Sequence, residues 1–220
     1  KGMNGIIQEL KCLLKTKSIG TDSDRALLLD FQATLETKPE KAIKLEKDAL
    51  AQIETITADN ARLVSNLHAN LGGLYRMNGH PDLAREHMEK SISLLDQFNL
   101  LHINDSIPQI ANYAMFLTEQ QEPERGISEL QKLSGIIKEY HSDHCLDYAK
   151  VQETLGTIYL MTANLPQAKT HFKRAFKIYE KIWADEPEMI EAKYQEIQEL
   201  YPQIGFFLGQ QLSDFLTKQT

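Results

Sequence analysis

Apolar residues recur along the chain with the spacing of helices that bury one face. The pattern i, i+4, i+7, i+8 is clear in Leu67, Leu71, Leu74 and Tyr75. Runs of this kind, separated by polar turns, predict an almost wholly helical chain. The expected helices cover residues 4–15, 23–37, 39–55, 60–78, 81–98, 105–120, 123–140, 145–163, 166–183, 187–200 and 203–217.

Prolines divide these helices into units of constant length. Pro39, Pro81 and Pro123 are 42 residues apart, and the next step falls on Leu165, beside Pro166. Proline is tolerated in the first turn of a helix, where its missing N–H would have had no partner. These positions therefore predict the starts of the second helix in successive helical hairpins.

Apolar and small residues repeat in the same register, which supports a repeat architecture. Large residues that recur fill holes between helices, and small residues that recur allow helices to approach closely. The columns in phase are Leu29, Leu71, Tyr113 and Leu155; Ala33, Tyr75, Leu117 and Tyr159; Ala42, Ala84, Gly126 and Ala168; and Ala49, Ser91, Leu133 and Ala175. These columns predict an all-α fold class, a solenoid of antiparallel helix hairpins.

We expect one solenoid domain over residues 1–220. It opens with a half repeat over 1–20, continues with repeats over 22–63, 64–105, 106–147 and 148–185, and ends with a divergent capping helix pair over 186–220. Lys1 and Gly2 are either remnants that precede Met3 or part of a longer protein, and a repeat register that opens with half a hairpin favours the longer protein.

Two copies resemble the tetratricopeptide repeat. The first is Leu71-Gly72-x-x-Tyr75 followed by Gly79, Ala84, Met88 and Ser91, and the second is Leu155-Gly156-x-x-Tyr159 followed by Ala168, Phe172 and Ala175. The 42-residue period is similar to the kinesin-light-chain-like variety of this repeat. Copies one and three depart from the pattern, with Asp30 and Ala114 in place of glycine and Glu46 and Leu130 in place of an aromatic residue.

This resemblance implies a right-handed superhelix whose first helices line a concave groove. The groove residues that it implies are Asn66, Asn70, Gly73, Arg76, Asn112, Met115, Lys150, Glu153 and Thr157. Asn70 and Asn112 are in phase, and their carboxamides could pair with the backbone of an extended peptide. They could equally bond neighbouring helices or face water. The clamp by which some family members grip a terminal carboxylate is absent, since its positions hold Leu27, Ala69, Ala111 and Glu153.

Composition narrows the partners of such a scaffold. The formal net charge of -7, without a basic cluster, speaks against direct binding of nucleic acid. No apolar run reaches the length of a membrane span, and no signal peptide is recognised. Cys12 and Cys145 lie far apart in the sequence, which favours free thiols and a cytoplasmic location. The exposed ends of a solenoid also allow a homodimer.

The sequence contains little evidence for metal binding or catalysis. The cluster His141, Asp143, His144 and Cys145 offers metal-ligand atoms, but no second group of ligands accompanies it. No nucleophile elbow, phosphate-binding loop or zinc-protease motif occurs. We therefore expect no metal, no cofactor and no enzymatic activity.

The sequence leaves two functions open. One is a scaffold that binds a protein or peptide in the concave groove, within a regulatory or adaptor protein. The other is a domain that senses a ligand or pheromone peptide and controls an attached output domain. An enclosed pocket with satisfied polar anchors would favour the sensor, whereas an open groove would favour the scaffold.

Overall fold

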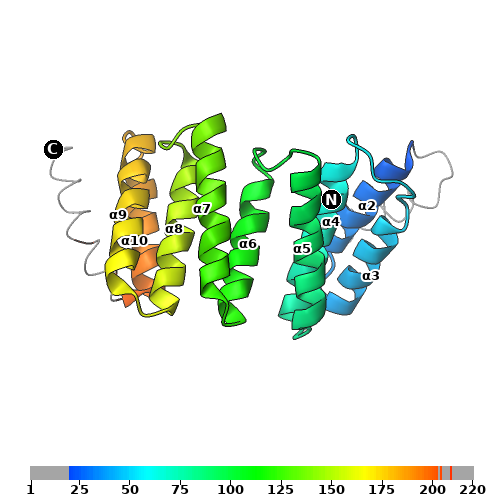
Figure 1. The fold of residues 1–220 in the computed structure, drawn as a ribbon, viewed down its shortest axis with the longest axis horizontal. Coiled ribbons are helices and arrows are strands. Elements are labelled where there is room, and N and C mark those ends of the chain that lie inside the picture. Colours follow the sequence, from blue (N-terminus) through cyan, green and yellow to red (C-terminus); the bar gives the residue numbers. More distant parts are fainter. Residues whose placement is uncertain (1–19, 203, 205–208, 210–220) are drawn as a thin grey trace. The chain divides into compact units, whose positions relative to one another are not determined.

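The computed structural model describes residues 20–202, 204 and 209. They form two compact units, one extending to Tyr113 and the other beginning at Ala114. Both units are built from helices joined by turns (Figure 1), and the described residues include no strand. The predicted helix 4–15 and nearly all of the predicted helix 203–217 lie outside these residues. The all-α fold of helical hairpins is confirmed, whereas a single domain over 1–220 stays a prediction.

The helices follow one another as predicted. The first unit contains α2 (Asp22–Thr34), α3 (Pro39–Leu50), α4 (Ala61–Met77), α5 (Pro81–Gln97) and the start of α6 (Ser106–Glu119). The second contains the end of α6, α7 (Pro123–Tyr140), α8 (Leu146–Met161), α9 (Leu165–Ile182) and α10 (Pro187–Leu200). We call α2, α4, α6, α8 and α10 first helices, and α3, α5, α7 and α9 second helices.

Helix α3 ends at Leu50 and not near residue 55 as predicted. The reason lies in Asn60, whose side chain accepts a hydrogen bond from the Thr57 N–H at 2.8 Å and donates one to the Thr55 carbonyl at 2.9 Å. Asparagine side chains that bond nearby backbone in this way favour turns over helix. The segment after α3 is therefore a loop ordered by one side chain.

Prolines start the second helices, as their spacing predicts. Pro39, Pro81 and Pro123 each occupy the first turn of α3, α5 and α7. An acidic residue in that first turn, such as Glu124 of α7, faces the positive end of the helix dipole. In α9 the proline stands one position later, after Leu165.

In three of the hairpins, the turn between the two helices has the same backbone conformation. Its central residue has a positive φ, of 73° at Gly79, 64° at Gln121 and 58° at Ala163, and these positions are one repeat apart. The next residue donates its N–H across the helix end, at 2.9 Å for His80, 2.8 Å for Glu122 and 2.7 Å for Asn164. This pattern is the Schellman cap that closes a helix and turns the chain.

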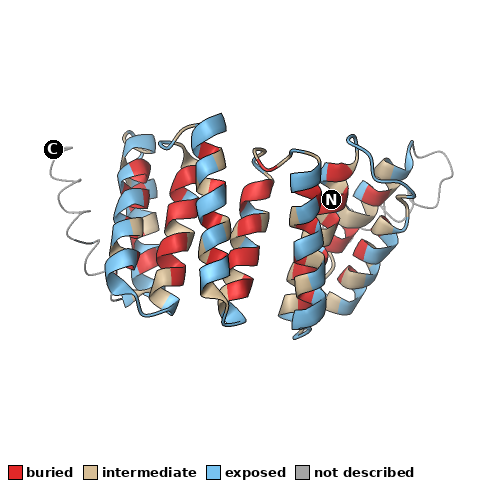
Figure 2. Ribbon diagram, in the orientation of Figure 1, coloured by how far each residue is buried: buried red, intermediate tan, exposed pale blue. Residues whose placement is uncertain are grey.

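The core lies between the two layers of each unit. The in-phase columns of the sequence are buried almost throughout, including Leu71, Leu117, Leu133 and Leu155. Figure 2 shows buried positions along each of the helices. Buried positions alternate with exposed ones along each helix, because each helix turns one face to its neighbours. The packing columns deduced from the sequence thus identify the core correctly.

A glycine on a first helix contacts a large residue on the following second helix. A Cβ added at Gly72 would lie 2.6 Å from Met88 Cγ, and one at Gly156 would lie 2.8 Å from Phe172. Glycine is therefore required where these helices cross. Copy three has Ala114 at this position and places a glycine on the partner helix instead, since a Cβ at Gly126 would lie 2.6 Å from the Ala114 carbonyl oxygen.

No helix in the described part of the chain combines the length and the apolar content needed to cross a bilayer.

Candidate functional site

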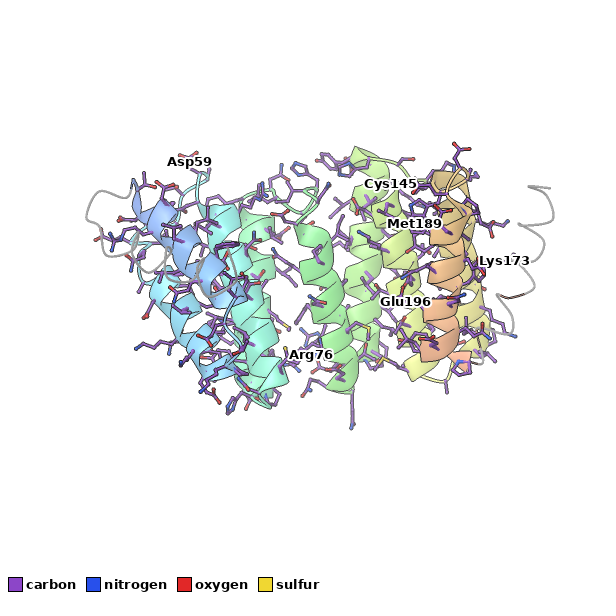
Figure 3. All side chains as sticks on the ribbon, turned by 180° about the vertical axis from the view of Figure 1, so that it is seen from behind. Asp59, Arg76, Cys145, Lys173, Met189 and Glu196 are labelled. Atoms are coloured by element: carbon purple, nitrogen blue, oxygen red, sulfur yellow. The ribbon has the colours of Figure 1, made fainter. Side chains whose placement is uncertain are left out.

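The first unit has a cleft between two successive first helices, α4 and α6. It encloses about 220 Å³, and the second helix α5 forms its floor. Its lining residues, here called the first-unit cleft, are Ala69, Gly73, Arg76, Met77, Met88, Ser91, Gln109 and Asn112. Figure 3 labels Arg76, near one end of α4. The cleft therefore lies on the helices from which the sequence predicts a groove.

The backbone is accessible at the middle of this cleft. A Cβ added at Gly73 would meet no atom within 4 Å, so this glycine leaves open space above the helix. Met77, one turn further along, is 81% exposed, whereas Met88 in the floor is buried. An open backbone stretch beside a flexible apolar side chain is a surface that can fit an irregular ligand.

A polar network fixes the side of the cleft. Gln109 accepts hydrogen bonds from the hydroxyls of Ser91 at 2.5 Å and Ser65 at 2.8 Å, and its amide donates to Asn66 Oδ1 at 2.5 Å. Ser65 and Ser91 are buried. Because buried hydroxyls are costly without partners, this network ties α4, α5 and α6 together at a defined spacing.

Two predicted asparagines are already engaged within the chain. Asn66 accepts from Gln109 and approaches Asp105 with its amide at 3.4 Å. Asn70 donates to Asp30 at 2.8 Å and to Glu46 at 3.2 Å. Bonding to neighbouring helices was the alternative interpretation of these side chains, and the geometry of Asn70 favours it.

The Asn112 side chain differs from that of Asn70. It is exposed, lines the first-unit cleft and has no partner within the part of the chain that the structure describes. Its donors and acceptor are therefore available to a ligand. Of the two in-phase asparagines, Asn70 is hydrogen-bonded to neighbouring helices, whereas the side chain of Asn112 is accessible in the cleft.

The second unit has a comparable cleft between the first helices α8 and α10. It encloses about 320 Å³, with the second helix α9 as its floor. This second-unit cleft is lined by Leu146, Lys150, Tyr179, Trp183, Met189, Ala192, Lys193 and Glu196. Met189 and Glu196 lie along the same side of α10 (Figure 3).

Charged and aromatic side chains are held rigidly at this cleft. Glu153 accepts from the Tyr179 hydroxyl at 2.7 Å and pairs with Lys193 at 2.8 Å. The Tyr179 ring stacks on Trp183, with centroids 4.9 Å apart. Both side chains of the Glu153–Lys193 pair are only 18% exposed. The attraction between their charges is therefore stronger than in a fully solvated pair.

These contacts shift the titration of the residues involved. Burial, and then the Glu153 carboxylate, raise the pKa of the Tyr179 hydroxyl above its ordinary value. Burial alone would lower the pKa of Lys193, but Glu153 and Glu196 beside it outweigh burial and raise it. The cleft therefore presents a neutral phenol and a charged ammonium at physiological pH.

The predicted site residues are divided between the two units. Gly73, Arg76 and Asn112 line the first-unit cleft, with Asn66 and Asn70 beside it. In the second unit Lys150 lines the cleft and Glu153 organises it, whereas Thr157 is buried and donates to the carbonyl of Glu153 in its own helix. Met115 is partly buried on α6. A ligand role for these nine residues stays a prediction.

Sequence reasoning missed the residues that form the floors of the clefts. Met88, Ser91 and Tyr179 lie on second helices and Trp183 caps α9, whereas the predicted groove residues all lie on first helices. Lys193 was missed because α10 belongs to a capping pair whose columns match the repeat poorly. A helical-wheel search of the second helices would have placed Tyr179 and Trp183, four residues apart, on one face.

The cluster of possible metal ligands has a structural explanation. Cys145 caps α8, accepting from the Tyr148 N–H at 3.5 Å and donating to the Ser142 carbonyl at 3.1 Å. His144 lies 3.4 Å from Asp143. Among the residues described, no three such side chains are grouped to hold a metal ion.

Successive helical hairpins, three of them closed by Schellman caps, with clefts between first helices, define a helical-repeat scaffold. Residues 106–181 match the family model of the tetratricopeptide repeat. BtubC (BKLC) from P. vanneervenii has the same fold, with a TM-score of 0.73 and 17% identity over 98% of this chain and 86% of that one.

Two further solved structures share the fold. The TPR-like repeats of a P. anserina protein described as a kinesin light chain have a TM-score of 0.65 and 15% identity over 81% of this chain and 90% of that one. A Rap protein complexed with competence and sporulation factor has a TM-score of 0.63 and 15% identity, over 98% of this chain and 58% of that one. The predicted tetratricopeptide resemblance is confirmed for residues 106–181, and the fold is shared with the TPR-like repeats of the kinesin light chain.

No curated protein matches the sequence closely enough to count as a relative.

Proposed function

We propose that this chain is a protein- or peptide-binding scaffold that holds its ligand along the first helices, as part of a regulatory or adaptor protein. The observation that carries the proposal is the recurrence of a cleft between consecutive first helices, in the first unit and again in the second. A scaffold that uses its repeats for binding is expected to repeat its clefts as well.

The size of the clefts supports a peptide more than a buried small molecule. Volumes of about 220 and 320 Å³ lie at or below the lower end of the range of small-molecule pockets, roughly 300–1,000 Å³. Each cleft suits one or two side chains of a longer ligand. An extended or helical segment that inserts a side chain into such a cleft gains affinity from several small contacts.

The chemistry of the clefts supports a ligand with both apolar and polar groups. Met77 offers an exposed apolar surface in the first unit, beside the open carboxamide of Asn112. In the second unit Trp183 and Met189 stand beside the charged Lys193 and Glu196. Apolar anchors ringed by polar groups are typical of peptide-binding surfaces.

A peptide-sensing domain that controls an attached output is the second candidate. It is favoured by the likeness to the Rap protein solved with competence and sporulation factor, of which this chain spans 58%. Both functions use a peptide ligand, so they differ in the consequence of binding. A change in an attached domain on peptide addition would select the sensor.

Peptide selection followed by calorimetry tests the proposal. Peptides enriched from a random phage library on the immobilised chain would be titrated into wild type, Asn112→Ala, Trp183→Ala and, as a control, Lys41→Ala on the outer side of α3. We expect a loss of about tenfold or more in affinity with Asn112→Ala or Trp183→Ala and no change with Lys41→Ala. Peptides that bind all four proteins equally, or a library that yields none, would contradict the proposal.

A further inference from the structure

A second cleft in the second unit is lined mainly by residues of second helices, and several of these residues are basic. It encloses about 710 Å³ between α7 and α9, where the loop before α8 closes one side. We call it the basic cleft, and its lining residues are Lys138, Asp143, His144, Tyr148, Arg174, Lys177, Ile178, Glu180 and Lys181. None of these residues lines the second-unit cleft.

The cations converge on this cleft from two helices. Lys138 lies on α7, and its ammonium stands 5.2 Å above the ring of the buried Tyr148. Arg174, Lys177 and Lys181 follow one face of α9, opposite the face that carries Tyr179 and Trp183. The basic cleft and the second-unit cleft are thus separate surfaces of α9.

The positive charge of the basic cleft is only partly balanced. Within the described part of the chain, Lys138, Lys177 and Lys181 form no ion pair. The two acids of the lining have other partners, since Asp143 lies 3.4 Å from His144 and Glu180 accepts from the Tyr194 hydroxyl at 3.1 Å. An excess of cations is unusual in a chain of net charge -7 and attracts an anionic ligand.

We propose that the basic cleft binds an acidic segment of a partner protein, with carboxylates spaced by about one helical turn. From Arg174 to Lys181 the cations of α9 span about 10 Å along the helix axis, at 1.5 Å per residue. A single phosphate contacts cations that surround one point, whereas this row matches several carboxylates in sequence. The lining also includes the largely buried apolar side chains of Ile178 and Tyr148.

A long nucleic acid is a poorer match to the same surface. Its phosphates would run beyond the cleft onto a chain of net charge -7, which would repel them. Charge complementarity within the cleft therefore favours a short acidic stretch.

Fluorescence anisotropy with a fluorescein-labelled octaglutamate peptide tests this proposal. Lys177→Glu on α9 and Lys138→Glu on α7 are compared with Lys173→Glu, an exposed α9 lysine that does not line the basic cleft. We expect saturable binding to wild type that weakens about tenfold with either cleft variant and less than about twofold with the control. Binding should also weaken several-fold between about 50 and 300 mM NaCl.

Other probes separate the alternatives. Octaglutamine should not bind, and neither pyrophosphate nor a decathymidylate oligonucleotide should displace octaglutamate at equal concentration. Stronger binding of either phosphate probe, or equal losses with Lys173→Glu and Lys177→Glu, would overturn the proposal. Asn112→Ala and Trp183→Ala should leave octaglutamate binding unchanged, so a failure of the proposed function remains distinguishable. Far-ultraviolet circular dichroism confirms that each variant is folded.

Discussion

At the scale of single residues, the most unusual feature is a carboxyl pair in the first repeat, in which Glu46 is buried and Asp30 is partly exposed. Asp30 and Glu46 occupy the positions that Gly72 and Met88 hold one repeat later, and Gly156 and Phe172 three repeats later. The close contact of a glycine with a large apolar residue is thus replaced by two acids. Asn70 bridges them by donating to both.

The Glu46 carboxyl is protonated in the folded protein at neutral pH. It is 1% exposed, and burial, followed by the neighbouring Asp30, raises its pKa to about 9. Its Oε2 atom receives no hydrogen bond among the described residues, as expected of an oxygen that carries a proton towards Asp30. A raised pKa means that the folded protein binds more protons than the unfolded chain between about pH 4.5 and pH 9.

Glu46→Gln should stabilise the protein at neutral and alkaline pH. Because wild type keeps a proton on Glu46 only in the folded state, its stability falls as the pH rises through that window. Glutamine keeps the size and the hydrogen bonds without titrating. We expect a gain of roughly 2–4 kcal/mol in the free energy of unfolding near pH 8 and almost none near pH 4, measured by urea denaturation.

Glu40→Gln, an exposed acid in the first turn of the same helix, is the matched control. It should change the free energy of unfolding by less than about 0.5 kcal/mol at either pH. Equal effects of the two substitutions, or a wild type whose stability does not fall with rising pH, would contradict a protonated Glu46.

The sequence predicts that copy one departs from the repeat pattern. It does not predict that the pKa of Glu46 is raised. Asp30 and Glu46 stand out at once as departures from the glycine and aromatic positions. Their contact depends on how α2 and α3 cross, which a single sequence does not provide. The same holds for Asn70 and Asn112, which are equivalent in sequence and differ only because the acids of copy one lie within reach of Asn70.

At the scale of elements, the turns of the second, third and fourth hairpins each hold one residue in a left-handed conformation. Glycine adopts it freely at Gly79, but Gln121 and Ala163 carry a Cβ there. The repeat of this turn is visible in the sequence only where glycine marks it. The other two copies keep the turn because the helices on either side fix its geometry.

Gln121→Gly and Ala163→Gly should each stabilise the protein, by about 0.5–1 kcal/mol. Relief of the strained φ outweighs the extra freedom that glycine has in the unfolded chain. The reverse change, Gly79→Ala, should destabilise by about 1 kcal/mol. Thermal unfolding followed by circular dichroism checks all three, and a destabilising effect of both glycine substitutions would contradict this account of the turns.

A polar contact joins the two helices of the second and fourth hairpins. In α4 and α5 it is a hydrogen bond between His68 Nδ1 and His87 Nδ1 at 2.9 Å, with Tyr75 stacked on His87. Two repeats later Gln152 and His171 make the same contact at 2.9 Å, and Tyr159 stacks on His171. The position is therefore a recurrent clasp, filled by different residues.

The histidine pair should make stability sensitive to acid. Burial, then the neighbouring His87, lower the pKa of His68 to about 4, and burial lowers that of His87 as well. The unfolded chain then binds more protons below about pH 6.5, so stability falls as the pH falls through this region. Two imidazolium groups cannot share a hydrogen bond, which adds to the loss.

His68→Gln copies the clasp of the fourth hairpin and should reduce this sensitivity. Between pH 7 and pH 5, the free energy of unfolding of this variant should fall by about 1 kcal/mol less than that of wild type. This value allows for solvent screening of the partly exposed ring. Urea denaturation at pH 7 and pH 5 measures the difference. The exposed His144→Gln serves as control, and an equal effect in both variants would argue against the clasp as its source.

At the scale of the whole molecule, the repeat explains which surfaces are available for binding. The faces that pack are fixed by the in-phase columns, and the clefts lie between first helices that the columns leave open. The sequence indicates which faces pack and which stay open, because apolar residues recur with the period of the packing. It does not indicate the floors of the clefts, the Glu153–Lys193 pair or the basic cleft, which need contacts between helices distant in sequence.

Hydroxyl-radical footprinting with a peptide selected on this chain tests the central claim most directly. Met77 marks the first-unit cleft, Trp183 and Met189 mark the second-unit cleft, and the exposed Tyr140 on α7 lies outside both. A ligand bound along the first helices should slow oxidation of Met77, or of Trp183 and Met189, by at least about threefold, and leave Tyr140 unchanged. Protection of Tyr140 alone, with both clefts oxidised as fast as in the free protein, would contradict it.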